Sequence, residues 1–322
     1  MMKRWINGLV AVSLLTTAHL ARAASSAHDP TLATVIAARS AGDRSRDAAR
    51  HPLETLAFFR VEPGMTVAEV LPGAGWYTRI LALYLGSDGA LYGVNYSDTM
   101  WPLFGRSEKW VAEQTAATNA FVKKVHGYVE ESIEVDGVKL GEVSAEVASA
   151  VDHTRALAPG LVDDIETGIE VRGFTFATVP AEIAGTVDRV LLIRALHNLN
   201  RFEAIAGTRT QALAAVRGML KDDGLVGVVQ HRLPESAPAE GSDGSRGYLK
   251  QSDVIAMFEQ AGFELIASSE INANPRDKPG DSEIVWRLPP SLSTSKDNPE
   301  LRAAMEAVGE SDRMTLLFRK AP

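Results

Sequence analysis

Three short segments of this sequence hold residue types that can bind a ligand or move a proton. The first, Glu69-x-x-x-Gly73-x-Gly75, places two glycines where a strand is expected to turn into a helix. Glycine lets the backbone approach a ligand closely, and the N-terminus of the next helix offers free N–H groups and a positive dipole end. The segment is therefore predicted to cradle a ligand. A purely structural turn remains the alternative, because a lone Gly-x-Gly is a weak motif.

The second segment, Arg194-Ala-Leu-His197-Asn198, follows a strand predicted over 186–192. Histidine titrates near neutral pH, so His197 is the candidate that removes a proton from a substrate. Arg194 and Asn198 are candidates for binding a substrate or cofactor carboxylate. The alternatives stay open: His197 as a hydrogen-bonded loop residue that fixes the strand end, and the other two as surface residues.

The third set lies further along the chain. His231 ends a strand predicted over 224–230, and Tyr248 precedes a helix predicted over 251–261. Both are candidate substrate-binding residues, because the carboxyl ends of parallel strands form the ligand edge of such a sheet. A structural histidine and a packed aromatic are the alternatives. The scattered His and Asp residues show no metal-ligand spacing, so we predict no metal.

The elements that must position these residues alternate between strands and helices. Strands are expected over 66–71, 90–96, 186–192, 224–230, 264–269 and 313–319, and helices over 52–60, 76–85, 208–220 and 251–261. This alternation predicts an α/β fold with a doubly wound, mostly parallel sheet covered on both faces. Insertions are predicted near 101–180, with a helix around 109–125, and near 272–300, whose Pro, Asp, Asn and Ser residues suggest a lid.

The first residues predict the compartment. Lys3 and Arg4 precede an uncharged, mostly apolar run over 5–20, and Ala21-Arg22-Ala23 supplies a small-x-small cleavage pattern. Residues 1–23 are therefore predicted to be a signal peptide cleaved after Ala23, since the run is short for a membrane span. The protein is expected to be exported to the periplasm, with an N-terminal helical segment over 24–60 and one domain over 61–322.

Charge and composition restrict the partners. The chain has a net charge of -8 and no cysteine. Loss of residues 1–23 removes three basic residues and no acid, which takes the charge to -11. An acidic balance disfavours nucleic acid and anionic lipid, and the lack of cysteine excludes disulfides, thiolate metal sites and a cysteine nucleophile. A small-molecule substrate is the expected partner.

The segment from Glu69 to Gly75 resembles the first motif of class I S-adenosylmethionine-dependent methyltransferases, in which an acidic residue precedes Pro-Gly-x-Gly. The resemblance covers 52–319 in outline and continues in order through 91–96, 187–192, 220–225 and 311–319. It extends to a bacterial group of exported proteins predicted to be methyltransferases, which share His197-Asn198-Leu199 and Asn274-Pro275-Arg276-Asp277. It implies a seven-stranded Rossmann-like sheet with an antiparallel last strand, and methyl transfer to a small-molecule acceptor.

The resemblance also implies roles for single residues. Pro72, Gly73, Ala74 and Gly75 would pass under the amino-acid and ribose parts of S-adenosylmethionine, and Glu69 would lie by its ammonium group. The family's second strand usually ends in an acid that binds both ribose hydroxyls. Here that position holds Asn95, which supplies no charged bidentate acceptor, and Asp98 is the candidate substitute.

Two other functions remain open from the sequence. One is a non-catalytic exported ligand-binding protein on the same fold, because S-adenosylmethionine is made in the cytoplasm and Asn95 departs from the pattern. The other is a nicotinamide-dependent oxidoreductase. That function is disfavoured because Thr78 stands where a dinucleotide fold has its third glycine, and because position 95 holds no acid.

Overall fold

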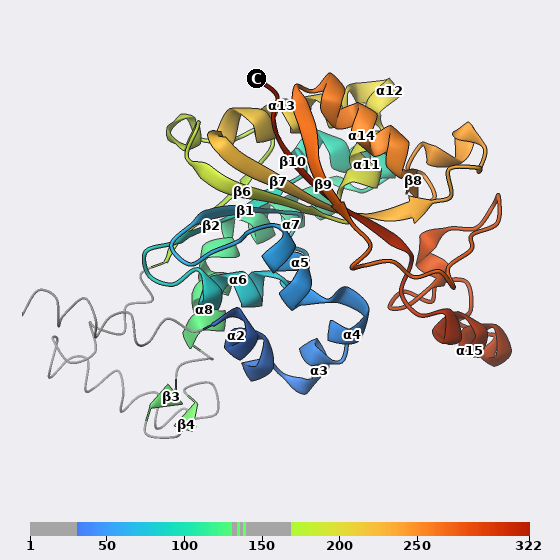
Figure 1. Cartoon of the computed structure of the whole chain (residues 1–322), viewed down its shortest axis with the longest axis horizontal. Helices are drawn as coiled ribbons and strands as arrows, with labels where there is room; N and C mark the ends of the chain where they lie inside the picture. Colours follow the sequence, from blue (N-terminus) through green and yellow to red (C-terminus); the bar gives the residue numbers. More distant parts are fainter. Residues whose placement is uncertain (1–30, 131–133, 136–137, 140–168) are drawn as a thin grey trace, which may run out of the picture.

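The computed structural model describes residues 31–130, 134–135, 138–139 and 169–322. The predicted signal peptide and part of the insertion predicted near 101–180, namely 131–133, 136–137 and 140–168, lie outside these residues. Figure 1 shows a central sheet with helices on both faces. A separate small hairpin is formed by β3 (Glu134–Val135) and β4 (Val138–Lys139).

The central sheet confirms the predicted fold class. Its strand order is β5-β2-β1-β6-β7-β10-β9, and the short β8 (Leu249–Lys250) pairs with the end of β7. Only β10 runs antiparallel to its two neighbours in this sheet. The strands are β1 (Thr66–Val70), β2 (Ala90–Asn95), β5 (Glu170–Thr175), β6 (Val187–Ile193), β7 (Leu220–Leu233), β9 (Phe263–Ser269) and β10 (Arg313–Lys320).

The central strands are buried on both faces, as is usual for parallel strands covered by helices. Alternate residues of β1 belong to two separate cores: Val67 faces one, and Ala68 and Val70 face the other. Figure 1 shows the helices that cover these cores. On one face lie α2 (Leu32–Ala38), α5 (Pro52–Phe58), α6 (Thr78–Tyr84) and α8 (Phe121–Glu130), and on the other α11 (Leu196–Arg201), α13 (Thr208–Met219) and α14 (Gln251–Gln260).

The N-terminal helical segment, described from residue 31, is broken into short helices that pack beside the start of α6. After α2 come α3 (Ala41–Arg44) and α4 (Asp47–Arg50), and His51 then turns the chain into α5 with a φ of 43°. The Trp76 ring lies against the guanidinium groups of Arg39 and Arg50, at 4.8 and 4.6 Å from the ring centroid. Trp76 therefore packs the helix start.

Two features of residues 101–180 differ from the prediction. The helix expected near 109–125 is divided at Ala120 into α7 (Glu108–Asn119) and α8. Strand β5 was not predicted, because an edge strand with partly exposed residues carries little hydrophobic alternation. Gly173 lets α7 approach this strand: a Cβ there would lie 2.1 Å from the Thr118 carbonyl oxygen.

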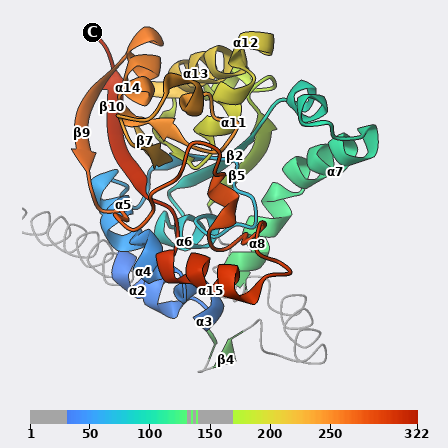
Figure 2. The ribbon, with the colours of Figure 1, turned by 90° about the vertical axis from the view of Figure 1, so that its right-hand side faces the viewer.

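The segment that follows β9 crosses the carboxyl edge of the sheet, as Figure 2 shows. It contains mostly turns, the short helix η6 (Val285–Arg287), and α15 (Pro299–Val308) before β10 begins. The lid predicted near 272–300 falls within this segment and stays a prediction. Two contacts to Asp277 hold this segment in place. The Tyr248 hydroxyl donates to the Asp277 carboxylate, and Arg287 binds the same carboxylate at 2.8 Å.

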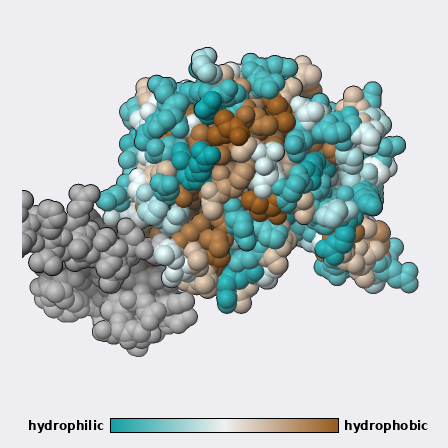
Figure 3. All heavy atoms as spheres, in the orientation of Figure 1, coloured by the Kyte–Doolittle hydropathy of each residue, from teal (hydrophilic) through white to brown (hydrophobic). Residues whose placement is uncertain are grey.

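The surface in Figure 3 is covered mostly by hydrophilic side chains, with apolar side chains in smaller groups. Over the described ranges, no helix combines the length and the apolar character that crossing a bilayer requires.

Candidate functional site

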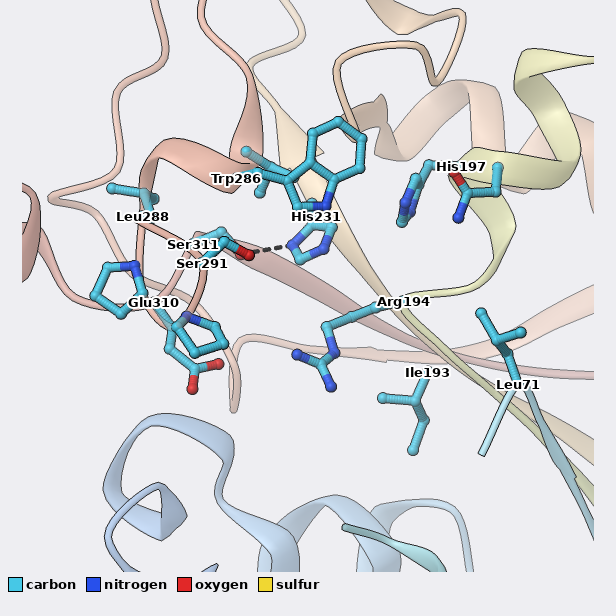
Figure 4. Close-up of a pocket in the computed structure, with 14 residues that line it drawn as sticks. Leu71, Ile193, Arg194, His197, His231, Trp286, Leu288, Ser291, Glu310 and Ser311 are labelled. Carbon is cyan, nitrogen blue, oxygen red and sulfur yellow. Dashed lines mark hydrogen bonds between the residues drawn. The ribbon is translucent and has the colours of Figure 1, made fainter. Parts of the chain in front are cut away.

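The carboxyl ends of β1, β6 and β7 open into a cavity of about 250 Å³, which we name the first cavity. Leu71, Arg194 and His231 reach it from the strand ends, and the segment over 285–291 forms the opposite wall (Figure 4). His197 and Asn198 line it from the start of α11. The structure thus brings together four of the residues that the sequence predicted: Arg194, His197, Asn198 and His231.

A second cavity of about 310 Å³ lies over the glycine loop and the end of β2. Pro72, Gly73 and Asn95 line it, together with side chains from α7 and α8. Leu71 lines both cavities, so the two spaces adjoin at this residue.

The glycine loop needs its glycines for backbone conformation. Gly73 and Gly75 have φ values of 57° and 81°, which side chains rarely adopt. Helix α8 lies along the loop: Lys124 Nζ donates to the Gly73 carbonyl at 2.8 Å, and a Cβ on Gly75 would lie 2.6 Å from the Tyr128 hydroxyl. Ala74 and Gly75 line neither cavity, and Gly75 packs against α8.

Glu69 lies buried beneath the loop and lines neither cavity. Its carboxylate accepts a hydrogen bond of 2.6 Å from the Thr78 hydroxyl. Burial raises the pKa of Glu69 to about 7, while the Thr78 hydrogen bond acts in the opposite direction. The bulk of Thr78 disfavours a dinucleotide-binding loop. The hydrogen bond explains why a threonine stands at this position, because its hydroxyl gives the buried Glu69 carboxylate a donor.

Asn95 lines the second cavity, but both ends of its amide have partners in the protein. Nδ2 donates to the Thr118 hydroxyl at 3.0 Å, and Oδ1 accepts from the Tyr96 backbone N–H at 2.8 Å. Asp98 begins η1 (Asp98–Phe104) and accepts from the Thr115 hydroxyl at 3.1 Å. It lines neither cavity.

The hydrogen bonds around His197 fix its tautomer. The Gln230 side-chain nitrogen donates to the carbonyls of His231 and Gly247, so the Gln230 oxygen is the acceptor in this network. That oxygen lies 3.2 Å from His197 Nδ1, which must carry the proton. His197 Nε2 therefore holds a lone pair, and none of the described residues donates a hydrogen bond to it.

Burial lowers the pKa of His197 to about 4 and that of His231 well below its ordinary value. Both rings are thus neutral near pH 7, and each keeps a lone pair on one ring nitrogen. Their centroids lie 5.5 Å apart, and His231 Nδ1 lies 2.6 Å from the Ser311 hydroxyl (Figure 4). Tyr248 lies behind His231, with ring centroids 6.3 Å apart, and is fully buried outside the cavity lining.

Arg194 extends into the first cavity, as Figure 4 shows. Its guanidinium forms no hydrogen bond or ion pair with any residue that the structure describes. Burial, reinforced by the charge of Arg313, lowers the pKa of Arg194 to about 10. The nearby Glu310 carboxylate is occupied by Arg46, Arg50 and Arg313.

Among the polar residues in and around the first cavity, Gln230, Glu310 and Ser311 were not predicted from the sequence. Gln230 lies inside an apolar strand, where a polar residue was itself a signal of a buried hydrogen-bond network. Glu310 and Ser311 precede the last strand, and its antiparallel direction brings its start to the ligand edge. In the described part of the chain, no group of three or more His, Cys, Asp or Glu side chains is arranged to hold a metal ion.

Comparison with known proteins finds no matching family model and no matching curated sequence. Among solved structures, the chain is similar to a SAM-dependent methyltransferase from Aquifex aeolicus, at 16% identity over 71% of this chain and 87% of that one, with a TM-score of 0.40. The cyclase SpnF gives 12% identity over 88% and 85%, with a TM-score of 0.46. A 1,6-didemethyltoxoflavin-N1-methyltransferase from Burkholderia thailandensis, with bound S-adenosylhomocysteine, gives 10% over 100% and 94%, with a TM-score of 0.39.

Proposed function

We propose that this protein transfers a methyl group from S-adenosylmethionine to a small-molecule acceptor. The observation that carries the proposal is the pair of cavities that adjoin at Leu71. One lies over the glycine loop that resembles the family's cofactor motif, and the other holds a neutral histidine with a free lone pair. A cofactor in the second cavity and an acceptor in the first would lie on either side of Leu71, and group transfer needs their reacting atoms in line there.

The loop backbone fits this cofactor. A Cβ on Gly73 would contact only the Leu71 carbonyl oxygen, at 3.8 Å, so the ligand side of Gly73 is open. Pro72 and Gly73 would hold the cofactor, and Asn95 would contact its ribose after exchanging its bond to Thr118. When bound, the cofactor supplies an activated methyl group.

The residues of the first cavity supply the remaining requirements. His197 Nε2 is the group that accepts the proton of an acceptor hydroxyl, and Gln230 holds the ring in the tautomer that permits this. Trp286 and the Pro289–Pro290 pair cover the strand ends and limit the entry of water.

A second candidate function is non-catalytic ligand binding on the same fold. The occupied amide of Asn95 and the contact between Lys124 and the glycine loop favour it. The Lys124 ammonium group would repel a sulfonium cofactor and attract an anionic ligand instead.

We further propose export to the periplasm with cleavage after Ala23, on the basis of residues 1–23. The expected observation is a mature protein in the periplasmic fraction whose first residue is Ala24. Intact Met1 on the folded protein would contradict the proposal.

Calorimetric titration with S-adenosylhomocysteine and S-adenosylmethionine, with NADH as the control ligand, tests the cofactor. We expect micromolar affinity for the two sulfur ligands, or roughly -8 kcal/mol. Gly73→Leu should abolish this binding. Gly64→Leu is the matched control, because Gly64 also has a positive φ and open space but lies at the opposite end of β1. Equal binding by both variants would show that the loop does not hold the cofactor.

A further inference from the structure

The cavity at the ends of β6 and β7 holds a positive charge that the described residues leave unpaired. Arg194 follows β6 with a φ of 59°, and its backbone N–H is fixed to the Val229 carbonyl at 2.7 Å. The half-buried side chain points into the cavity, and its guanidinium has no acceptor in the described part of the chain. Cationic groups in such surroundings are normally paired, because their transfer from water is costly.

The neighbouring charges add to this surplus. Glu310 is a single carboxylate that receives hydrogen bonds from Arg46 at 2.8 Å, Arg50 at 3.3 Å and Arg313 at 3.2 Å. Arg50 and Arg313 are almost fully buried, and Arg313 Nε is a buried donor without a partner in the described structure. Three guanidinium groups therefore share one carboxylate, and the charge of Arg194 lies near the same carboxylate without contacting it, although the whole chain is acidic.

The shape and lining of the first cavity restrict the anion that would complete it. A guanidinium presents a planar fork that matches a carboxylate, and only one such fork is free among the described residues of this cavity. Trp286, Leu288 and Ile193 supply apolar surface beside it. The volume of about 250 Å³ suits a small molecule. His197 lines the same space with an unprotonated Nε2, which suits a hydroxyl on the same ligand.

We propose that the first cavity binds a small organic carboxylate through Arg194, and that the methyl acceptor is a hydroxy acid of this class. The first part stands without the methyltransferase function, whereas the second part rests on it. The carboxylate has two chemical sources, the acceptor and the methionine end of the cofactor. We assign it to the acceptor, because Arg194 lies among the residues of the first cavity and not among those that line the second.

The test compares 4-hydroxybenzoate with its neutral counterpart 4-hydroxybenzyl alcohol, by calorimetry and by the shift of the unfolding temperature. We expect the carboxylate to bind at least tenfold more tightly than the alcohol. Arg194→Gln should lose at least tenfold in carboxylate affinity, whereas Arg172→Gln, which changes an exposed arginine on β5, should bind normally. Far-ultraviolet circular dichroism and the unfolding temperature establish that both variants are folded.

Equal affinity for acid and alcohol, or unchanged affinity in Arg194→Gln, would overturn the anion site. A second titration, at saturating S-adenosylhomocysteine, identifies the source of the carboxylate. Retained binding of 4-hydroxybenzoate supports the acceptor. If the two ligands instead compete, and Arg194→Gln weakens the binding of both, then Arg194 binds the carboxylate of the cofactor. That result would overturn the proposal that the acceptor is a hydroxy acid. If 4-hydroxybenzoate binds but neither sulfur ligand does, the methyltransferase proposal fails and the anion site stands.

Discussion

Leu71 and Arg194 are the first residues beyond two neighbouring parallel strands, and both adopt the left-handed conformation, with φ values of 54° and 59°. The backbone N–H of Leu71 donates to Val94, and that of Arg194 to Val229, each at 2.7 Å. Each residue thus ends its strand against the next strand outward. Non-glycine residues in this conformation cost about 1 kcal/mol or more, and such strain gathers at functional sites. Both of these residues line the first cavity.

Replacement of Arg194 by Met should stabilise the ligand-free protein. The substitution removes a half-buried cation that repels Arg313 and has no acceptor among the described residues. We expect the free energy of unfolding to rise by roughly 1–3 kcal/mol, as measured by urea denaturation. Arg172→Met, at an exposed position, should stay within about 0.5 kcal/mol of the unmodified protein. A loss of stability in Arg194→Met would mean that the guanidinium is paired in solution.

The pKa of His197 predicts a loss of stability in acid. Unfolded histidine binds a proton near pH 6.5, whereas His197 does so only near pH 4. Below pH 6.5 the unfolded chain therefore holds more protons, and the free energy of unfolding falls as the pH falls, by on the order of 3 kcal/mol at pH 4. His197→Gln removes this contribution. As the pH falls from about 7 to 5, the free energy of unfolding of the variant should decrease by about 2 kcal/mol less than that of the unmodified protein, as measured by urea denaturation.

The contribution of Glu69 to the free energy of unfolding changes with pH in the opposite direction to that of His197. Burial raises its pKa from 4.5 to about 7, so the folded protein retains a proton that the unfolded chain releases. This contribution is complete below pH 4.5 and is lost as the pH rises through 7. Glu69→Gln keeps an acceptor for Thr78 but has no proton to release. As the pH rises from roughly 5 to 7, the free energy of unfolding of Glu69→Gln should increase by about 2 kcal/mol relative to that of the unmodified protein. A flat difference across this range would contradict the buried environment of Glu69.

Gly173 sets the distance between β5 and α7. Gly173→Ala would place a Cβ 2.1 Å from the Thr118 carbonyl oxygen, so the strand or the helix must move. We expect a loss of about 1–3 kcal/mol in the free energy of unfolding. Gly127→Ala is the matched change: Gly127 lies in α8 with no atom within 4 Å of its added Cβ, and should gain about 0.5–1 kcal/mol. Equal effects at the two positions would show that β5 and α7 separate without cost.

The sequence predicted the residues at the strand ends for a topological reason. Parallel strands present their carboxyl ends at one edge, so Arg194, His197 and His231 could be placed together once the strands were located. The hydrogen bond between His197 and Gln230 could not be placed in this way. It depends on the register between β6 and β7 and on which face of β7 each side chain takes. Strand β5 was missed because its partly exposed edge position weakens the hydrophobic pattern.

The roles implied for Glu69 and Asn95 depended on contacts that sequence spacing does not define. Thr78 stands nine positions after Glu69, yet one turn of chain brings its hydroxyl onto the carboxylate. Thr118 reaches Asn95 from a helix whose break at Ala120 was not predicted. The sequence placed the glycine turn between a strand and a helix, where β1 and α6 flank it, while the hydrogen-bond partners of each side chain came from neighbouring helices. The roles of Glu69 and Asn95 in cofactor binding stay predictions.

The ion pairs of Glu310 with Arg46 and Arg50 join positions 264 and 260 residues apart. During synthesis, Arg46 and Arg50 leave the ribosome long before Glu310, their carboxylate partner, is added to the chain. The wall of the first cavity therefore cannot assemble until almost the whole polypeptide has been made. A prematurely terminated product that ends before residue 310 would contain the complete glycine loop but leave Arg50 buried without its counter-charge. We expect proteases to degrade such fragments more readily than the complete chain.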